Sequence, residues 1–148
     1  MTVDKRFRVA EYRWEYGNLI PRSVIRHYAR EIAERFRPDK IILFGSYAYG
    51  KPHKDSDVDI LVVMPAKDEI NQAVRILEKT NSAFPLDLIV RTPHNLRWRL
   101  KEGDWFLREI VARGRVLYEK ARRGVSSKGR KRFPSREKPG RHASTRAR

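Results

Sequence analysis

The order of the apolar segments constrains this chain more than any other feature of its sequence. Short continuous apolar runs occupy residues 40–44, 58–64 and 86–90, with Gly or Pro at their boundaries, as is typical of buried strands. Apolar residues recur at steps of three and four within residues 21–37 and 68–80, which predicts amphipathic helices. The resulting order of elements predicts an α/β (α+β) fold in which helices flank a small mixed sheet of about three to four strands.

Capping residues predict the elements that follow. Thr92 and Pro93 suit the cap and first turn of one helix, and Asp104 suits the cap of another, which ends at Gly114. Residues 115–119 fit either a last edge strand or a docking segment. In the helix predicted over 68–80, the apolar residues mark one face: Ile70, Ala73, Val74 and Leu77.

The charge of the chain is concentrated at its C-terminal end. Lys and Arg number 34 against 18 for Asp and Glu, a formal net charge of +16. Residues 121–148 contain eleven of these basic residues, one acidic residue and little apolar content, so we expect a disordered basic tail. The tail is interpreted either as an electrostatic arm for RNA, DNA or an acidic partner, or as a solubilising extension.

Composition excludes several classes of protein. The chain has no cysteine, which excludes disulfide scaffolds, thiol catalysis and Cys-ligated metal centres and favours a reducing compartment. No apolar run approaches the roughly 20 residues of a membrane span. The N-terminal residues are charged where a secretory signal would be apolar. We therefore expect a soluble, cytoplasmic protein with no membrane contact.

Three aspartates are the candidate metal ligands. Asp57 and Asp59 are two residues apart at the start of a predicted strand, so both carboxylates project from one face with Cα atoms about 6–7 Å apart. Carboxylates this close repel unless a cation lies between them, and Mg²⁺ commonly binds one or two carboxylates together with substrate phosphates. Asp87 lies within another apolar strand, and it can reach the same site if the two strands pair.

A small-residue turn is the candidate phosphate site. Gly45 and Ser46 end a predicted strand and precede a predicted short helical turn, whose free backbone N–H groups can bind an anion. Lys51 and Ser56 belong to the loop expected to lie over the phosphates, and we assign them to the nucleotide-binding set. Ser56 is interpreted as a turn or capping residue and not as a nucleophile. Carboxylates for metal opposite a turn for phosphate predict nucleotidyl transfer.

These residues resemble a known signature. The segment GSYAYGKPHKDSDVDILVV is similar to that of the DNA-polymerase-β-type nucleotidyltransferase superfamily, in which Gly-Ser precedes Asp-x-Asp by ten residues and a third Asp lies on a later strand. The small size and the segments PLDLIVRTP and EGDWFLREIVARGRVLYEK resemble the minimal nucleotidyltransferases, among them the MntA-like antitoxins of HEPN/MNT toxin–antitoxin pairs.

The resemblance implies a role for each residue of the motif. Asp57 and Asp59 would bind two Mg²⁺ ions, Asp87 would complete the metal site and help activate the acceptor hydroxyl, and Gly45 and Ser46 would hold the β- and γ-phosphates. For the antitoxin branch it implies ATP as donor, a tyrosine hydroxyl of a HEPN-type toxin as acceptor, and an AMP–protein adduct with pyrophosphate as products.

One position departs from the pattern of the resemblance. Many relatives have a basic residue where Tyr49 stands. The corresponding phosphate contact is then either missing or supplied by Lys51 or Lys54. This departure bears on rate and nucleotide preference and leaves the metal site as expected.

The sequence leaves alternatives open. We divide the chain into an N-terminal extension (1–20), a minimal nucleotidyltransferase domain (21–120) and the basic tail (121–148). The alternative to an enzyme is a non-catalytic nucleotide- or nucleic-acid-binding module that neutralises a partner by contact. Aromatic residues near the N-terminus either pack on the body or form a partner-binding or base-stacking surface: Phe7, Tyr12, Trp14 and Tyr16. Trp98 and Trp105, at the junction of two predicted helices, either pack in the core or at its edge or form the surface for the acceptor protein.

Overall fold

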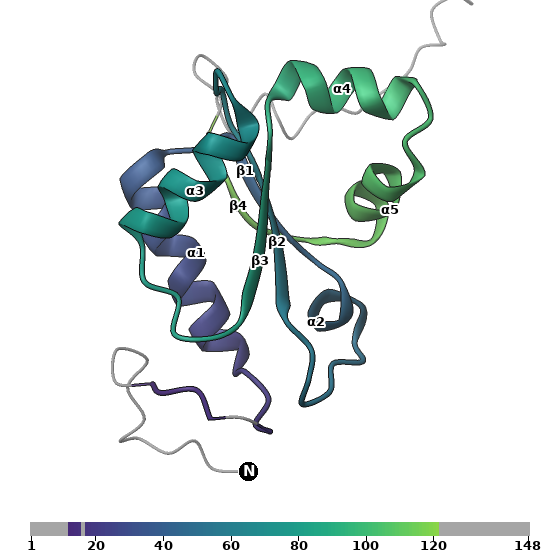
Figure 1. Ribbon diagram of the computed structural model, residues 1–148. Coiled ribbons are helices and arrows are strands. Elements are labelled where there is room, and N and C mark those ends of the chain that lie inside the picture. Colours follow the sequence, from purple (N-terminus) through teal and green to yellow (C-terminus); the bar gives the residue numbers. More distant parts are fainter. Residues whose placement is uncertain (1–11, 16, 122–148) are drawn as a thin grey trace, which may run out of the picture.

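The computed structural model describes residues 12–15 and 17–121 and contains one four-stranded sheet with helices on both faces (Figure 1). Within these residues no helix has the length and apolar character needed to cross a membrane. The elements, in chain order, are α1 (Arg22–Phe36), β1 (Lys40–Phe44), α2 (Ser46–Tyr49), β2 (Val58–Val63), α3 (Glu69–Lys79), β3 (Leu86–Arg91), α4 (Pro93–Lys101), α5 (Trp105–Arg113) and β4 (Arg115–Glu119).

The sheet is mixed, as the sequence predicts. Its strand order is β3-β2-β1-β4, with β1 antiparallel to both of its neighbours and β2 parallel to β3. Residues 115–119 form the edge strand β4, one of the two roles expected for them. The predicted strands keep their positions, with changes of one residue at the ends of β2 and β3.

Two apolar layers hold the helices against the sheet. Buried residues of α1 and α3 pack on one face of the sheet, and buried residues of α5 pack on the other, with α4 at the margin of that second layer. Figure 1 shows α1 and α3 on one side of the strands and α4 and α5 on the other. Because side chains alternate between faces along a strand, each residue of β2 is assigned to one layer: Ile60 belongs to the α1 layer and Leu61 to the α5 layer.

Helix α3 buries a different face from the one its apolar pattern marks. Ile76 is completely buried against the sheet, whereas Ile70 is 76% exposed. Val74 and Leu77 are exposed as well. The helix was therefore predicted in the right place, but most of its apolar stripe faces outward.

Side-chain contacts fix the start of α4 and its corner with α5. The side chains of Thr92 and Asp104 accept hydrogen bonds from the backbone N–H groups of Asn95 and Leu107, at 3.0 and 3.1 Å, which confirms both predicted caps. The Arg108 guanidinium donates two hydrogen bonds to the Leu100 carbonyl, at 3.1 and 3.0 Å. These contacts hold the first turn of α5 in a defined position.

Some predictions lie outside the described residues. The tail falls there except for Ala121, as do Phe7 and Tyr16. Tyr12 and Trp14 are described and pack, partly buried, against the layer that contains α1, so the packing interpretation is confirmed for these two aromatic residues.

Candidate active site

The pairing of β2 with β3 brings the predicted aspartates together. Asp59 and Asp87 are direct partners in the parallel register, so their Cα atoms lie about 5 Å apart. Asp57 directly precedes β2. The sequence predicts that Asp87 reaches the site if its strand pairs beside the strand that carries Asp59. The two strands do pair.

The carboxylates lie on the face that carries α5. Leu61 and Val63 in β2 and Ile89 in β3 belong to the apolar layer of α5. Asp59 lies two residues before Leu61, and Asp87 lies two residues before Ile89, so their side chains project from the same face as these apolar residues. The acidic site is thus open on the sheet face opposite α1 and α3.

Electrostatics show that the three side chains interact. The pKa of Asp59 is raised from 3.8 to about 6, first by burial and then by the negative charges of Asp87 and Asp57. A carboxylate that is destabilised in this way binds either a proton or a cation more readily.

The donor set fits a hard divalent cation, although it is not arranged as a closed cage. Three carboxylates offer the oxygen ligands that Mg²⁺ prefers, and their mutual repulsion is what a bound cation would relieve. Among the described residues, no group of three or more acidic, His or Cys side chains already has the geometry of a metal site. Substrate phosphates and waters would have to complete the coordination.

Gly45 places the phosphate turn directly on the acidic site. Its backbone has φ 75° and ψ −162°, a conformation that is almost confined to glycine. A Cβ atom at this position would overlap the Asp59 carboxylate. Both conformation and space therefore require glycine here, and the turn lies against Asp59 with the first backbone N–H groups of α2 following it.

Contacts at both ends anchor the short helix α2. The hydroxyl of Tyr47, a buried residue, accepts a hydrogen bond from the Ile20 backbone N–H at 3.1 Å. At the other end, the Arg115 guanidinium donates to the Ala48 carbonyl at 3.0 Å. The turn at Gly45 and Ser46 is thus held from the segment before α1 and from β4.

The loop between α2 and β2 holds the other predicted nucleotide-binding residues. The Ser56 hydroxyl accepts a hydrogen bond from the His53 backbone N–H at 2.9 Å, and the Ser56 N–H donates to the His53 carbonyl at 2.8 Å. This is the expected turn role for Ser56. Lys51 is exposed in the same loop, and its backbone N–H donates to the Ser46 carbonyl at 3.1 Å. Contact of either residue with a nucleotide stays a prediction.

Two side-chain contacts on this face were not predicted from the sequence. The Arg113 guanidinium lies 4.1 Å from the centre of the Tyr49 ring, so α5 places a cation beside the residue that departs from the expected pattern. Phe44, at the end of β1, packs edge-to-face with Phe106 of α5. Both contacts join residues more than 60 positions apart, and no local signal in the sequence indicates them.

The exposed tryptophans correct one interpretation. Trp98 is 53% exposed and Trp105 is 72% exposed, so packing in the core is wrong for both side chains, and packing at the edge of the core stays a prediction. Trp105 also lies edge-to-face with Phe106, with ring centres 6.5 Å apart.

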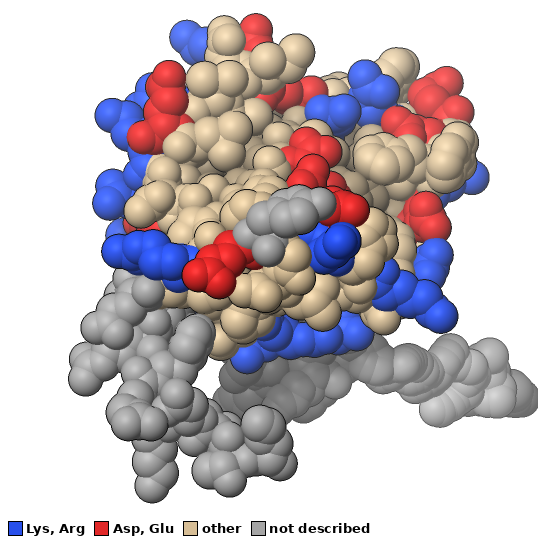
Figure 2. All heavy atoms as spheres, turned by 60° about the horizontal axis from the view of Figure 1, so that its bottom comes forward, with Lys and Arg blue, Asp and Glu red and all other residues tan. Residues whose placement is uncertain are grey.

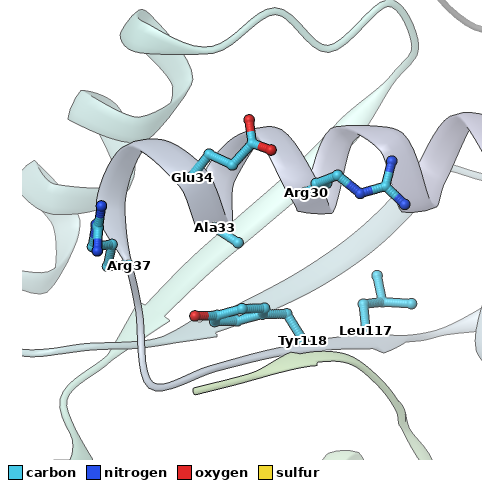
Figure 3. Close-up of a pocket in the computed structure, with 6 residues that line it drawn as sticks. All are labelled: Arg30, Ala33, Glu34, Arg37, Leu117 and Tyr118. Carbon is cyan, nitrogen blue, oxygen red and sulfur yellow. The ribbon is translucent and has the colours of Figure 1, made fainter. Parts of the chain in front are cut away.

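Two hollows in the described surface lie away from the carboxylates. Figure 3 shows one of about 410 Å³ between α1 and β4, where Arg30 and Glu34 lie above Leu117 and Tyr118. It is on the opposite sheet face from Asp59 and at the opposite edge from β3. A groove of about 790 Å³ lies between α4, α5, β1 and β4 at the other end of the strands, near Lys40 and Val63. Neither hollow is a continuation of the acidic site.

Charge on the surrounding surface is mixed. Figure 2 shows the face at the bottom of Figure 1, where acidic side chains lie both near the centre and around the rim, interspersed with basic side chains.

Comparison with known proteins identifies the class to which this fold and site belong. A family model described as nucleotidyltransferase domain matches residues 25–118, and the chain belongs to this family. The predicted nucleotidyltransferase fold is thereby confirmed, as is the assignment to nucleotidyltransferase enzymes.

Named relatives narrow the comparison. Protein adenylyltransferase MntA of Thermococcus cleftensis is 39% identical over 91 residues, which cover 60% of this chain and 88% of the relative. A candidate protein adenylyltransferase of Methanocaldococcus jannaschii is 32% identical over 101 residues, covering 65% of this chain and 96% of the relative. The resemblance to MntA-like proteins that the sequence predicts is confirmed.

Solved structures with similar folds are more distant. A crystal structure of the toxin–antitoxin pair MntA–HpeT has a TM-score of 0.46 and 21% identity, covering 64% of this chain and 73% of that chain. A candidate nucleotidyltransferase of Sulfolobus solfataricus has a TM-score of 0.40 and 22% identity, covering 49% and 67%.

Proposed function

We propose that this chain is a Mg²⁺-dependent protein adenylyltransferase that transfers AMP from ATP to a tyrosine hydroxyl of a partner protein, a HEPN-type toxin for which it is the antitoxin. The observation that carries the proposal is the pairing of Asp59 with Asp87 beside the Gly45 turn. The name of the relative from Thermococcus cleftensis, protein adenylyltransferase MntA, supports the same activity.

The residues of the site have distinct roles in this proposal. Gly45 and Ser46 bind the β- and γ-phosphates through backbone N–H groups. Asp57, Asp59 and Asp87 are the side chains that would hold two Mg²⁺ ions, and the ions, when bound, neutralise the phosphate charge. The pairing of β2 with β3 keeps Asp59 and Asp87 close in spite of their repulsion.

The reaction exchanges a phosphoanhydride bond of ATP for a phosphoester bond to the acceptor. The acceptor oxygen attacks the α-phosphorus, the bond between the α-phosphorus and the oxygen that bridges it to the β-phosphorus breaks, and pyrophosphate leaves. The proton of the acceptor hydroxyl passes to a carboxylate oxygen, a role that we assign to Asp87. Its exposure at the edge of the sheet gives an acceptor protein access to it.

The test follows the fate of two labels. The chain, Mg²⁺ and the protein encoded beside it are incubated with ATP labelled at either the α- or the γ-phosphate. Label from the α-phosphate should appear on the partner and label from the γ-phosphate should not. Asp59→Asn should abolish labelling, and Glu102→Gln, an exposed acid at the α4–α5 corner, should retain it.

Two results would contradict the proposal. If the pair associates and no α-label reaches the partner, the chain is not a protein adenylyltransferase for that partner. If Asp57→Asn and Asp59→Asn leave neutralisation of the partner intact, the binding-module alternative explains the function better.

A further inference from the structure

The first turn of α5 exposes two adjacent aromatic rings. Trp105 is 72% exposed and Phe106 is 43% exposed, and their rings are nearly perpendicular with centres 6.5 Å apart. Large aromatic side chains usually contribute to stability by burial. An exposed pair of this kind is therefore a candidate surface for a flat apolar ligand.

Phe44 connects this pair to the carboxylates. The rings of Phe106 and Phe44 pack edge-to-face with centres 5.7 Å apart. Phe44 is the antiparallel partner of Asp59, and opposite residues in such a pair project from the same face with Cα atoms about 5 Å apart. Phe44 is itself buried, and through it the exposed pair on the first turn of α5 is joined to the strand position opposite Asp59.

Buried residues of α5 and the contacts of its first turn fix the position of the two rings. Leu107 and Ile110 are completely or almost completely buried and hold α5 on the sheet. Asp104 caps the helix, and Arg108 ties its first turn to the Leu100 carbonyl. A ligand that stacks on these rings meets a surface that is already ordered, which lowers the entropic cost of binding.

We propose that Trp105 and Phe106 form the nucleobase-binding wall of the site, with the base of the donor nucleotide stacked on the Trp105 indole. The inference rests on the proposed function, because that function places the triphosphate at Gly45 and the carboxylates. The base then extends beyond the α-phosphate by the length of a ribose, toward the surface that Phe106 and Trp105 form.

The size of the surface favours a base over a protein. Two side chains offer far less area than the roughly 800 Å² per partner of a standard protein interface. They do suit a single base, since stacking on aromatic side chains is a general mode of base binding. Stacking tolerates any base, so we expect ATP and GTP to bind with similar affinity.

The test measures nucleotide binding and not turnover. ATP with Mg²⁺ should quench tryptophan fluorescence of the wild type and of Trp98→Phe, because Trp98 lies on α4, after the opposite end of β3 from Asp87. Trp105→Phe should lose the quenching yet keep affinity within a few-fold, as it retains a ring. Trp105→Ala should weaken ATP binding by roughly five- to 150-fold in calorimetry, and Phe106→Leu should weaken it as well.

A ligand without a base provides the control. Binding of inorganic tripolyphosphate with Mg²⁺ should be the same in the wild type and in Trp105→Ala. If both variants, Trp105→Ala and Phe106→Leu, bind ATP as tightly as the wild type, the inference is wrong and the proposed function stands. If they lose only affinity for the partner protein, the aromatic pair is a docking surface and the inference is again wrong. If the folded wild type binds no ATP at all, the proposed function fails with it.

Discussion

Asp59 should destabilise the metal-free protein at neutral pH, and Asp59→Asn should relieve this effect. Burial and the charges of Asp87 and Asp57 raise the pKa of Asp59 to about 6 in the folded chain, against an ordinary value of 3.8. Between these two values the folded chain binds more protons than the unfolded chain. The free energy of unfolding therefore falls as pH rises through this interval, and the loss is complete above the folded-state pKa.

The size of the effect follows from the pKa difference. A rise from 3.8 to about 6 corresponds to at most about 3 kcal/mol, at about 1.4 kcal/mol per pH unit. Asp59 retains some contact with solvent, which screens its charge, so we expect about 1–2 kcal/mol. Asn has nearly the shape of the protonated acid, and Asp59→Asn should therefore raise stability by this amount at about pH 8 and by a few tenths of a kcal/mol at about pH 4.

Urea unfolding followed by circular dichroism measures the difference directly. Glu102→Gln is the control, since it removes the same charge from an exposed position away from the acidic site and isolates the effect of net charge. It should change stability by less than about 0.5 kcal/mol at either pH.

Magnesium should narrow the difference in stability between the wild type and Asp59→Asn. At a concentration tenfold above its Kd, a cation that binds only the folded state stabilises it by about 1.4 kcal/mol. The wild type should gain this stability at about pH 8 and Asp59→Asn should gain less, at ionic strength matched with NaCl. Equal stability of the wild type and Asp59→Asn in metal-free buffer at this pH would refute the electrostatic reasoning.

The remaining predictions concern the turn, the faces of α3 and the tail. Gly45→Ala places a Cβ atom on the Asp59 carboxylate at a φ of 75°, so it should cost about 1–3 kcal/mol in urea unfolding and weaken ATP binding. Ile76→Ala should cost about 2–5 kcal/mol, whereas Ile70→Ala, at 76% exposed, should change stability by less than about 0.5 kcal/mol; equal costs would contradict the orientation of α3. Deleting residues 121–148 should weaken binding to poly(U) RNA and flatten its salt dependence, and an unchanged slope would show that the tail makes no phosphate contacts.

Local signals were sufficient to predict the elements. Strand β1 was predicted with the bounds that the structure gives, because a continuous apolar run lies between Pro38 and Gly45. The caps at Thr92 and Asp104 were likewise visible, since a capping side chain acts within three residues of its own position.

Packing between distant segments could not be predicted from the sequence. Periodicity predicted α3 but marked Ile70 and Val74, which the structure exposes, and only packing against the sheet selects the face that carries Ile76. The sequence indicated that Asp87 could reach the site if its strand paired with the strand of Asp59. It could not show whether the strands pair, because strand order depends on how distant segments meet. The contact between Phe44 and Phe106 was missed for the same reason.

Two unusual features coincide at one point of this fold. Gly45 adopts a backbone conformation that other residues avoid, and the carboxylate that it contacts, Asp59, is itself destabilised by burial and by Asp87. Asp59→Asn could remove the repulsion without disturbing the apolar layers, which lie elsewhere in the sheet. Charge repulsion of this kind persists where a ligand repays it. A polyphosphate with its cation would relieve the repulsion and occupy the turn at once, which is why we assign both features to one nucleotide site.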